Sequence, residues 1–190
     1  MKKTSIIEML DNAGAYLKGH FVLSSGLHSG QYLQCALLLR YPNYAEELCK
    51  ALARKFKKQK IDVVVGPAYG GIIVAYELAR ALGVRAIFTE RKDGVMMLRR
   101  NFKIEKGESV LIAEDVVTTG RSVKDVIRAI TPYKPKIVGI ASLIDRSSKK
   151  YPFGKISFKS LVKISIKAYT QKSCPMCKKK IPLLKPGSRK

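Results

Sequence analysis

The chain has 190 residues, 46% of them hydrophobic, which is enough for one folded domain with a buried core and excludes global disorder. Its 37 Lys and Arg outnumber its 14 Asp and Glu, and the resulting net charge of +23 indicates an anionic partner. No apolar run approaches the about 20 residues that cross a bilayer, and Glu8 and Asp11 interrupt the apolar N-terminal run, which excludes an ordinary signal peptide. We therefore expect a soluble, cytoplasmic protein with no membrane partner.

The predicted elements begin with a helix whose start is marked by the capping-box pattern Ser5 to Glu8. Residues 12–30 are predicted to form extended segments broken by turns, and a second helix is predicted to follow Asn43. Further along, short β-branched runs alternate with helical stretches. The predicted strands are 61–65, 84–88, 110–113 and 137–143, and the predicted helices are 72–82, ended by Gly83, and 123–130. This alternation predicts an α/β fold with a parallel sheet covered on both faces.

Two segments stand apart from this alternation. Residues 90–106 are polar and lack periodicity, which predicts a long loop or a mobile hairpin. Residues 162–168 alternate between apolar and polar side chains, which predicts a half-exposed strand. We expect a single domain with an N-terminal segment at 1–40, a core at 41–150, and a C-terminal strand and basic tail at 151–190.

The four cysteines are predicted to be free thiols, because the chain carries no export signal. Cys174 and Cys177 have the spacing of half a zinc site, but the neighbouring sequence lacks the other half. The chain's two histidines, His20 and His28, lie far away in the sequence. We therefore favour a lysine-flanked turn in the tail over a structural metal.

The stretch VLIAEDVVTTGRSV places Glu114 and Asp115 at the end of a predicted strand, where ligands of open parallel sheets gather. Carboxylates accept hydrogen bonds only, which suits the adjacent hydroxyls of a ribose or a hydrated magnesium ion. The residues that follow open a helix, whose N–H groups and dipole favour an anion. The hydroxyl donors of this turn are Thr118, Thr119 and Ser122. The pattern predicts a site for a ribose 5-phosphate; the alternative is an N-cap turn with a surface acidic pair.

This stretch resembles the phosphoribosyl-pyrophosphate signature of type I phosphoribosyltransferases. Further segments resemble the orotate phosphoribosyltransferase family and occur in the same order as in that family: 19–36 (GHFVLSSGLHSGQYLQCA), 63–72 (VVVGPAYGGI), 88–94 (FTERKDG) and 142–147 (SLIDRS). The tail, CPMCKKKIPLLKPGSRK, resembles the ending of shorter bacterial members. The resemblance covers essentially the whole chain and implies a type I phosphoribosyltransferase fold with a small N-terminal hood.

The function implied by the resemblance is transfer of ribose 5-phosphate from phosphoribosyl pyrophosphate to orotate. The products would be orotidine 5′-monophosphate and pyrophosphate, in pyrimidine (UMP) biosynthesis. Mg²⁺ is the implied cofactor; it would be held mainly by phosphoribosyl pyrophosphate, with Asp115 as a candidate protein ligand. A homodimer with shared active sites is also implied, because the family's mobile loop usually reaches the neighbouring subunit's site.

The resemblance assigns roles residue by residue. The residues implied in binding phosphoribosyl pyrophosphate are Glu114, Asp115, Val116, Val117, Thr118, Thr119, Gly120, Arg121, Ser122, Ala68, Tyr69, Gly70, Arg91 and Lys92. The residues implied in binding orotate are Ser25, Gly26, Tyr32, Thr118 and Arg146. The implied catalytic residues are Arg91, Lys92 and Asp115. In this scheme the two cations lie in the mobile loop and stabilise charge on the departing pyrophosphate.

Several positions depart from the family pattern. A lysine and a histidine common in the mobile loop are replaced by residues 94–97, and Arg99 and Arg100 are the candidates to substitute for them. Lysines frequent in the pyrophosphate loop and in the N-terminal segment are Gly70 and Ser24 here.

These departures leave a phosphoribosyltransferase for a purine or another base as an alternative function. Arg121 is also unusual in the phosphate turn, where it contacts phosphate or points into solvent. The basic charge leaves a third hypothesis, a regulator on the same fold that binds nucleic acid. The sequence contains no separate helix-turn-helix pattern, which argues against that hypothesis.

Overall fold

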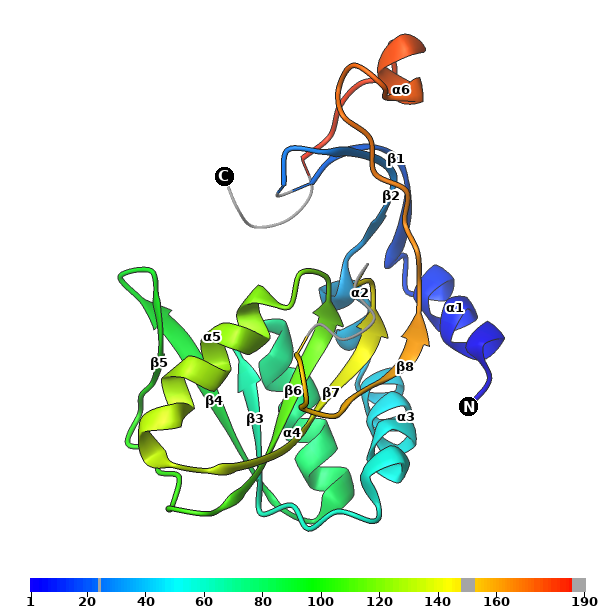
Figure 1. The fold of residues 1–190 in the computed structure, drawn as a ribbon. Coiled ribbons are helices and arrows are strands. Elements are labelled where there is room, and N and C mark those ends of the chain that lie inside the picture. The colour runs from blue at the N-terminus through cyan, green and yellow to red at the C-terminus, as the bar shows by residue number, and fades with distance from the viewer. Residues whose placement is uncertain (24, 148–152, 186–190) are drawn as a thin grey trace.

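Figure 1 shows the fold in a computed structural model that describes residues 1–23, 25–147 and 153–185. Two sheets organise the chain: an antiparallel pair, β1 Tyr16–Val22 with β2 His28–Leu33, and a main sheet in the order β5-β4-β3-β6-β7-β8. The main-sheet strands are β3 Val63–Pro67, β4 Arg85–Lys92, β5 Val95–Leu98, β6 Ser109–Val117, β7 Lys136–Asp145 and β8 Phe158–Lys163. The helices are α1 Lys3–Asn12, α2 Cys35–Leu39, α3 Pro42–Ala53, α4 Gly70–Leu82, α5 Arg121–Ile130 and α6 Pro175–Lys178, with 3-10 turns at Arg54–Phe56 and Thr131–Tyr133.

The main sheet is parallel from β4 to β8, whereas β5 pairs antiparallel with β4 at the edge. α3 and α4 cover one face and α5 covers the other (Figure 1). Side chains of β3 pack on both faces of the sheet, because successive residues of a strand point to opposite sides. Val64 belongs to the core cluster that includes α3 and α4, whereas Val63 and Val65 belong to the cluster that includes α5. Burial on both faces explains why these strands are continuous apolar runs, and the α/β fold with a parallel sheet is confirmed.

The structure corrects several predicted boundaries. α1 begins at Lys3 and its N-cap, Lys2, makes no side-chain capping bond, so the capping box at Ser5 is wrong. α3 begins at Pro42, a residue suited to a first helical turn, so Asn43 lies inside the helix. The helix predicted to end at Gly83 does end there.

Residues 90–106 combine strand and loop: β4 extends to Lys92 and turns into β5, so the hairpin interpretation holds for the first part of this segment. β8 lies earlier than the predicted strand at 162–168, because the strand ends at Lys163. The short helix α2 has no counterpart among the predicted elements.

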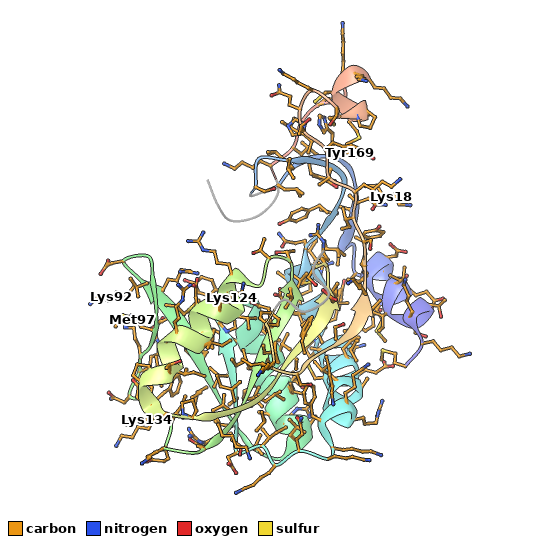
Figure 2. All side chains as sticks on the ribbon, viewed as in Figure 1. Lys18, Lys92, Met97, Lys124, Lys134 and Tyr169 are labelled. Carbon is orange, nitrogen blue, oxygen red and sulfur yellow. The ribbon has the colours of Figure 1, made fainter. Side chains whose placement is uncertain are left out.

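The β1–β2 hairpin projects beyond the carboxyl edge of the main sheet, and the C-terminal tail runs along it to α6 (Figure 1). Backbone bonds hold the tail there: Tyr169 exchanges N–H and carbonyl bonds of 2.8 Å each with His28, and Leu184 donates to the His20 carbonyl at 2.8 Å. Tyr169 lies at this upper end of the molecule in Figure 2. Within the described ranges, every helix is too short or too polar to span a lipid bilayer.

Candidate active site

Glu114 and Asp115 occupy the carboxyl end of β6, at the centre of the main sheet. Glu114 is 7% exposed, and Asp115 is half-buried. Burial, followed by the nearby charge of Asp115, holds the pKa of Glu114 well above its usual range. Burial also raises the pKa of Asp115, against the hydrogen bonds that it receives. Ionising the pair is therefore costly, and a hydrogen-bond donor or cation placed on it lowers that cost.

The loop between β3 and α4 lies directly against this pair. A Cβ added at Gly70 would lie 2.5 Å from the Asp115 Oδ2, so a residue with a side chain at position 70 would displace the carboxylate. This contact gives a physical reason for the glycine at position 70, where the resemblance to orotate phosphoribosyltransferases implies a frequent lysine. The preceding Ala68–Tyr69 peptide is cis, and the Ala68 N–H donates to the Thr89 carbonyl at 2.7 Å. The loop and the acidic pair, far apart in the sequence, thus form one site.

The turn after β6 leads straight into α5. Its N-cap is Gly120, with φ 73°, and the one side-chain contact to a first-turn amide among the described residues is a long one, from the Arg121 N–H to the Thr119 Oγ1 at 3.4 Å. Thr118 and Thr119 are exposed beside these amides. A Cβ at Gly120 would also lie 2.7 Å from the ring of Phe153, which packs against the turn. Because its N-cap glycine offers no side-chain acceptor and no acidic residue stands in the first turn, this end of α5 suits an anion, as the sequence predicts.

Arg146 is on the other side of the acidic pair, just after β7. Burial lowers the pKa of its guanidinium, while the nearby Cys35, Tyr32 and Tyr16 oppose that shift. The Nε of Arg146 is buried and has no hydrogen-bond partner among the described residues. A half-buried cation whose buried Nε is an unused donor favours a ligand that accepts hydrogen bonds, such as a carboxylate.

Cys35 is a site residue that sequence reasoning missed. Its thiol pKa is raised well above the ordinary value by burial, then by the charges of Asp115 and Glu114, and Arg146 opposes the rise. These influences indicate that the first residue of α2 lies near both the acidic pair and the arginine. The sequence carries no signal for this, because α2 is too short to show a helical period.

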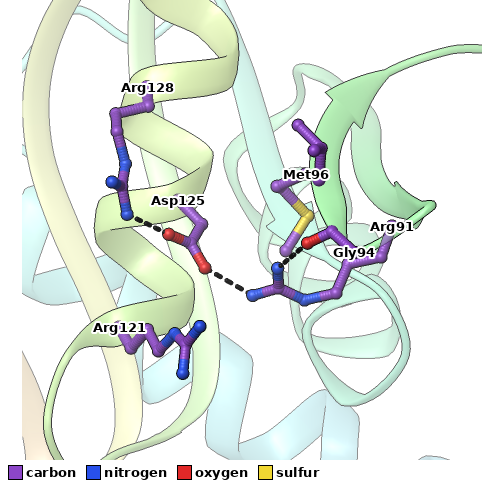
Figure 3. Close-up of a pocket in the computed structure, with 7 residues that line it drawn as sticks. Arg91, Gly94, Met96, Arg121, Asp125 and Arg128 are labelled. Carbon is purple, nitrogen blue, oxygen red and sulfur yellow. Dashed lines mark hydrogen bonds and ion pairs between the residues drawn. The ribbon is translucent and has the colours of Figure 1, made fainter.

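Arg91 lines a hollow of about 300 Å³ between the β4–β5 hairpin and α5, together with Gly94, Val95, Met96, Arg121, Asp125 and Arg128. Arg91 donates to Asp125 and, at 2.8 Å, to the Gly94 carbonyl, and Arg128 donates to the same aspartate (Figure 3). The guanidinium of Arg121 lies on the same wall as Asp125. Three arginines and one aspartate line this hollow, which gives it a net positive charge beside the turn after β6.

Other predicted site residues are more remote from this constellation. Ser25 and Gly26 lie exposed in the turn between β1 and β2, beyond the edge of the main sheet, and Ser24 lies outside the described residues. Lys92 is exposed near the tip of the β4–β5 hairpin (Figure 2). Arg99 and Arg100 both pair with Glu90, at 3.1 Å and 3.0 Å.

Comparison with known proteins places this site in a family. The phosphoribosyl transferase domain matches residues 38–170, which include the acidic pair, the loop at Gly70 and Arg146. The orotate phosphoribosyltransferase of Caldanaerobacter subterraneus subsp. tengcongensis is 54% identical over 190 residues, covering 100% of both chains. The chain belongs to the orotate phosphoribosyltransferase family.

Further relatives agree with this membership. The orotate phosphoribosyltransferase of Thermotoga maritima is 48% identical over 184 residues, covering 97% of this chain and 98% of that one. Among solved structures, orotate phosphoribosyltransferase from Aeropyrum pernix matches with TM-score 0.69 and 25% identity, covering 84% of this chain and 93% of that one. An adenine phosphoribosyltransferase from Thermoanaerobacter pseudethanolicus shares the fold, with TM-score 0.63 and 15% identity, covering 70% of this chain and 88% of that one.

The raised pKa of Glu114 leads to a stability prediction. Ionising this buried carboxyl costs free energy in the folded state; the cost is absent below its ordinary pKa and appears as pH rises through the raised pKa. We expect Glu114→Gln to raise the free energy of unfolding of the ligand-free protein by about 1 kcal/mol or more at neutral pH. The gain should shrink toward about pH 4.

Urea unfolding across this pH range measures the effect. Glu8→Gln, on the exposed side of α1, is the matched control and should change stability little at any pH. A Glu114→Gln protein that is less stable than the parent at neutral pH would show that the ionised carboxylate is a net stabiliser.

Proposed function

We propose that the protein transfers ribose 5-phosphate from phosphoribosyl pyrophosphate to orotate, giving orotidine 5′-monophosphate and pyrophosphate in pyrimidine biosynthesis. The single observation that carries the proposal is the buried acidic pair held between Gly70 and the start of α5. Its oxygens suit two vicinal hydroxyls, and the backbone amides at the start of α5, a few residues away, suit the 5′-phosphate. Membership of the family supports the reaction type, and these contacts support the proposed binding roles.

The protein's part in the reaction is positional and electrostatic. Glu114 and Asp115 would accept hydrogen bonds from the ribose hydroxyls, which fixes the sugar carbon that is attacked. Orotate brings its own ring nitrogen nucleophile. The developing charge on the departing pyrophosphate would be stabilised by the backbone donors of the Ala68–Gly70 loop and by the cations Arg91 and Lys92. Asp125 would hold Arg91 at the hollow beside the phosphate turn.

Mg²⁺ fits the donor set of this site. Carboxylate oxygens are the ligands that the ion prefers, and Asp115 is half-buried, so one carboxylate can meet a hydrated ion that is bound mainly through substrate phosphates. When bound, the ion neutralises charge on the pyrophosphate group. Glu114 and Asp115 would keep the sugar hydroxyls oriented toward it.

Arg146 is the proposed contact for the carboxylate of orotate, with Tyr32 nearby on β2. The buried Nε and the guanidinium fork match a planar carboxylate. The β1–β2 hairpin would then act as the hood over the base, and closure would bring the turn at Ser25 and Gly26 toward the ligand. A reducing, cytoplasmic location suits the enzyme, because its four cysteines are free thiols.

The base-selectivity assay is the direct test. With phosphoribosyl pyrophosphate and Mg²⁺, we expect turnover of orotate and at least about a hundredfold lower kcat/KM for adenine, hypoxanthine, guanine, xanthine and uracil. The reason is that bases without the carboxylate leave Arg146 unpaired. Substantial purine turnover without orotate turnover would reject the proposal in favour of a purine enzyme.

Arg146→Lys tests the orotate contact more narrowly. The substitution keeps the charge but removes the fork, so we expect KM for orotate to rise roughly tenfold to a hundredfold. KM for phosphoribosyl pyrophosphate should stay within about twofold, because that substrate binds at the other side of the acidic pair. Steady-state kinetics with each substrate varied separately provides the readout. Arg40→Lys, at an exposed arginine after α2, is the control and should leave both KM values near those of the parent. If Arg146→Lys raises KM for phosphoribosyl pyrophosphate more than KM for orotate, the assignment is contradicted.

We further propose a homodimer. Tyr69, Ile73 and Tyr76 are 87%, 40% and 64% exposed, and their spacing puts them on one side of α4 and its N-terminus. This apolar stripe begins at the loop that contacts the acidic pair, so a second copy seated on it would lie beside the active site. Lys92, on the exposed hairpin, is then placed to act on the partner's substrate.

Subunit mixing tests shared sites. Asp115→Asn and Lys92→Ala should each be nearly inactive alone, the first for weak ribose positioning and the second for weak stabilisation of pyrophosphate. If the hairpin serves the neighbouring subunit, a mixed dimer has one site with both native residues. An equimolar, reassociated mixture should therefore recover about a quarter of the parent activity.

Light scattering should show dimers throughout this experiment. Asp11→Asn, at an exposed residue of α1, replaces Asp115→Asn in the control mixture and should itself be active. No recovery in mixtures with proven heterodimers would show that Lys92 acts within its own chain.

A further inference from the structure

Four side chains that bind metals well converge where the tail crosses the β1–β2 hairpin: His20 on β1, His28 on β2, and Cys174 and Cys177 around α6. Their ligand atoms all lie within 4.8 Å of one another. The sequence distance between the histidines and the cysteines argues against a common site, but the pairing of the tail with the hairpin removes that objection. The turn favoured at Cys174 and Cys177 is therefore part of a four-residue cluster.

The spacing within the cluster is that of a metal coordination shell. The His20 Nε2 lies 2.9 Å from the His28 Nδ1, 3.5 Å from the Cys174 Sγ and 3.6 Å from the Cys177 Sγ, and the Cys177 Sγ lies 3.2 Å from the His28 Nδ1. Zinc bonds of about 2.0–2.1 Å to nitrogen and about 2.3 Å to sulfur give tetrahedral edges of about 3.3–3.8 Å. These four distances lie within about half an ångström of those edges, and the remaining pairs of ligand atoms lie no more than 4.8 Å apart.

The histidine orientation also suits a ligand. The His20 Nδ1 lies 2.8 Å from the Ile181 carbonyl, which can only accept, so Nδ1 carries the proton. The Nε2 lone pair then points into the cluster. A backbone carbonyl bonded to the far nitrogen of a histidine is the usual outer partner of a zinc-bound imidazole, because it fixes the tautomer and the ring.

We propose that His20, His28, Cys174 and Cys177 form a structural zinc site that fastens the C-terminal tail to the β1–β2 hairpin. The ligand set, two imidazoles and two thiolates in a tetrahedron, selects Zn²⁺ among the common divalent ions. Four protein ligands fill the shell, so the site is structural and takes no part in phosphoribosyl transfer.

Burial supports the same conclusion. The exposed fractions of His20, His28 and Cys174 are 2%, 5% and 0%, and Cys177 is half-buried. Polar side chains are this deeply buried here although the surrounding tail is mostly exposed and rich in lysine. The metal provides the reason for burying them, because it satisfies all four ligand atoms at once.

The tail also lacks any other strong anchor. None of its described residues from 167 to 185 belongs to either hydrophobic core cluster. Ile181, Leu183 and Leu184 are 41%, 47% and 54% exposed. Apart from backbone bonds and the contact of the Ser29 hydroxyl with the Lys167 carbonyl at 2.9 Å, little apolar burial holds this segment in place. Small segments without a core are commonly stabilised by a metal, whose binding free energy becomes folding free energy.

The competing state is a metal-free cluster in which the His28 Nδ1 proton bonds the His20 Nε2. In that state the two thiols keep their protons and make only weak contacts. The two states differ in metal content, in the spectrum of a cobalt-substituted protein, and in the response of the tail to chelators. None of these readouts depends on the transferase activity.

The test uses full-length protein without a histidine tag, expressed with zinc in the medium and desalted. We expect about one zinc per chain by mass spectrometry of the metal, and less than about a tenth of that in Cys177→Ser and in His28→Gln. Cobalt substitution of the parent should give a thiolate charge-transfer band and tetrahedral ligand-field bands, which Cys177→Ser should lose. Cys49→Ala is the matched control, since this buried cysteine lies in the main core and its loss should leave the zinc content unchanged.

Proteolysis reports on the tail directly. Trypsin should cleave at the exposed lysines Lys172, Lys178 and Lys179 at least about tenfold faster after chelation of the parent, and readdition of zinc should restore protection. Chelator should leave the cleavage rate of Cys177→Ser unchanged. Parent protein that binds no zinc on titration would overturn the proposal. Zinc content that is unchanged from the parent in both Cys177→Ser and His28→Gln would also overturn it. A Cys174–Cys177 disulfide in protein kept under reducing conditions would also overturn it.

Discussion

The contact on which the active site depends is the one between the Asp115 carboxylate and the backbone at Gly70. It joins the end of β6 to the start of α4 so closely that no side chain fits between them. Glu114, beside Asp115, is held in the same dry surroundings, and burial raises the pKa of both carboxyls. Ionising these carboxyls is thus costly in the folded chain, and a bound sugar with hydroxyl donors together with a cation would lower that cost.

The main sheet makes this contact possible. β3 and β6 are adjacent parallel strands, so their carboxyl ends and the helices that follow open at the same edge. The loop after β3 brings its backbone to the site and the end of β6 contributes the carboxylates, while Arg146 follows β7 on the far side. Backbone amides at a helix start, an acidic pair and a half-buried guanidinium therefore meet at one edge of the sheet, an arrangement that suits the proposed ribose, phosphate and base.

Much of this edge could be predicted from the sequence, because its signals are local. Val110 to Ser122 contains the strand, the acidic pair and the helix start in one run, and the β-branched runs identify the neighbouring strands. The roles of Ser25, Lys92 and Arg146 rest on resemblance, since no local pattern indicates which strand ends lie together. Cys35 escaped detection because its position follows from tertiary packing alone, and the caps at Ser5 and Asn43 failed because the helices begin at Lys3 and Pro42.

The tail shows the same limit of local patterns. Cys174 and Cys177 form half of a ligand set, and His28 is 149 residues before Cys177, a separation that no spacing rule bridges. The fold closes this distance by leading the chain from β8 along the hairpin that carries the histidines. A cross-link between such distant positions removes much of the freedom of the unfolded chain, so one metal there would stabilise the tail more than a few exposed apolar contacts can. Because the same hairpin carries Tyr32 toward Arg146, fixing its outer end would also limit how far the proposed hood can move.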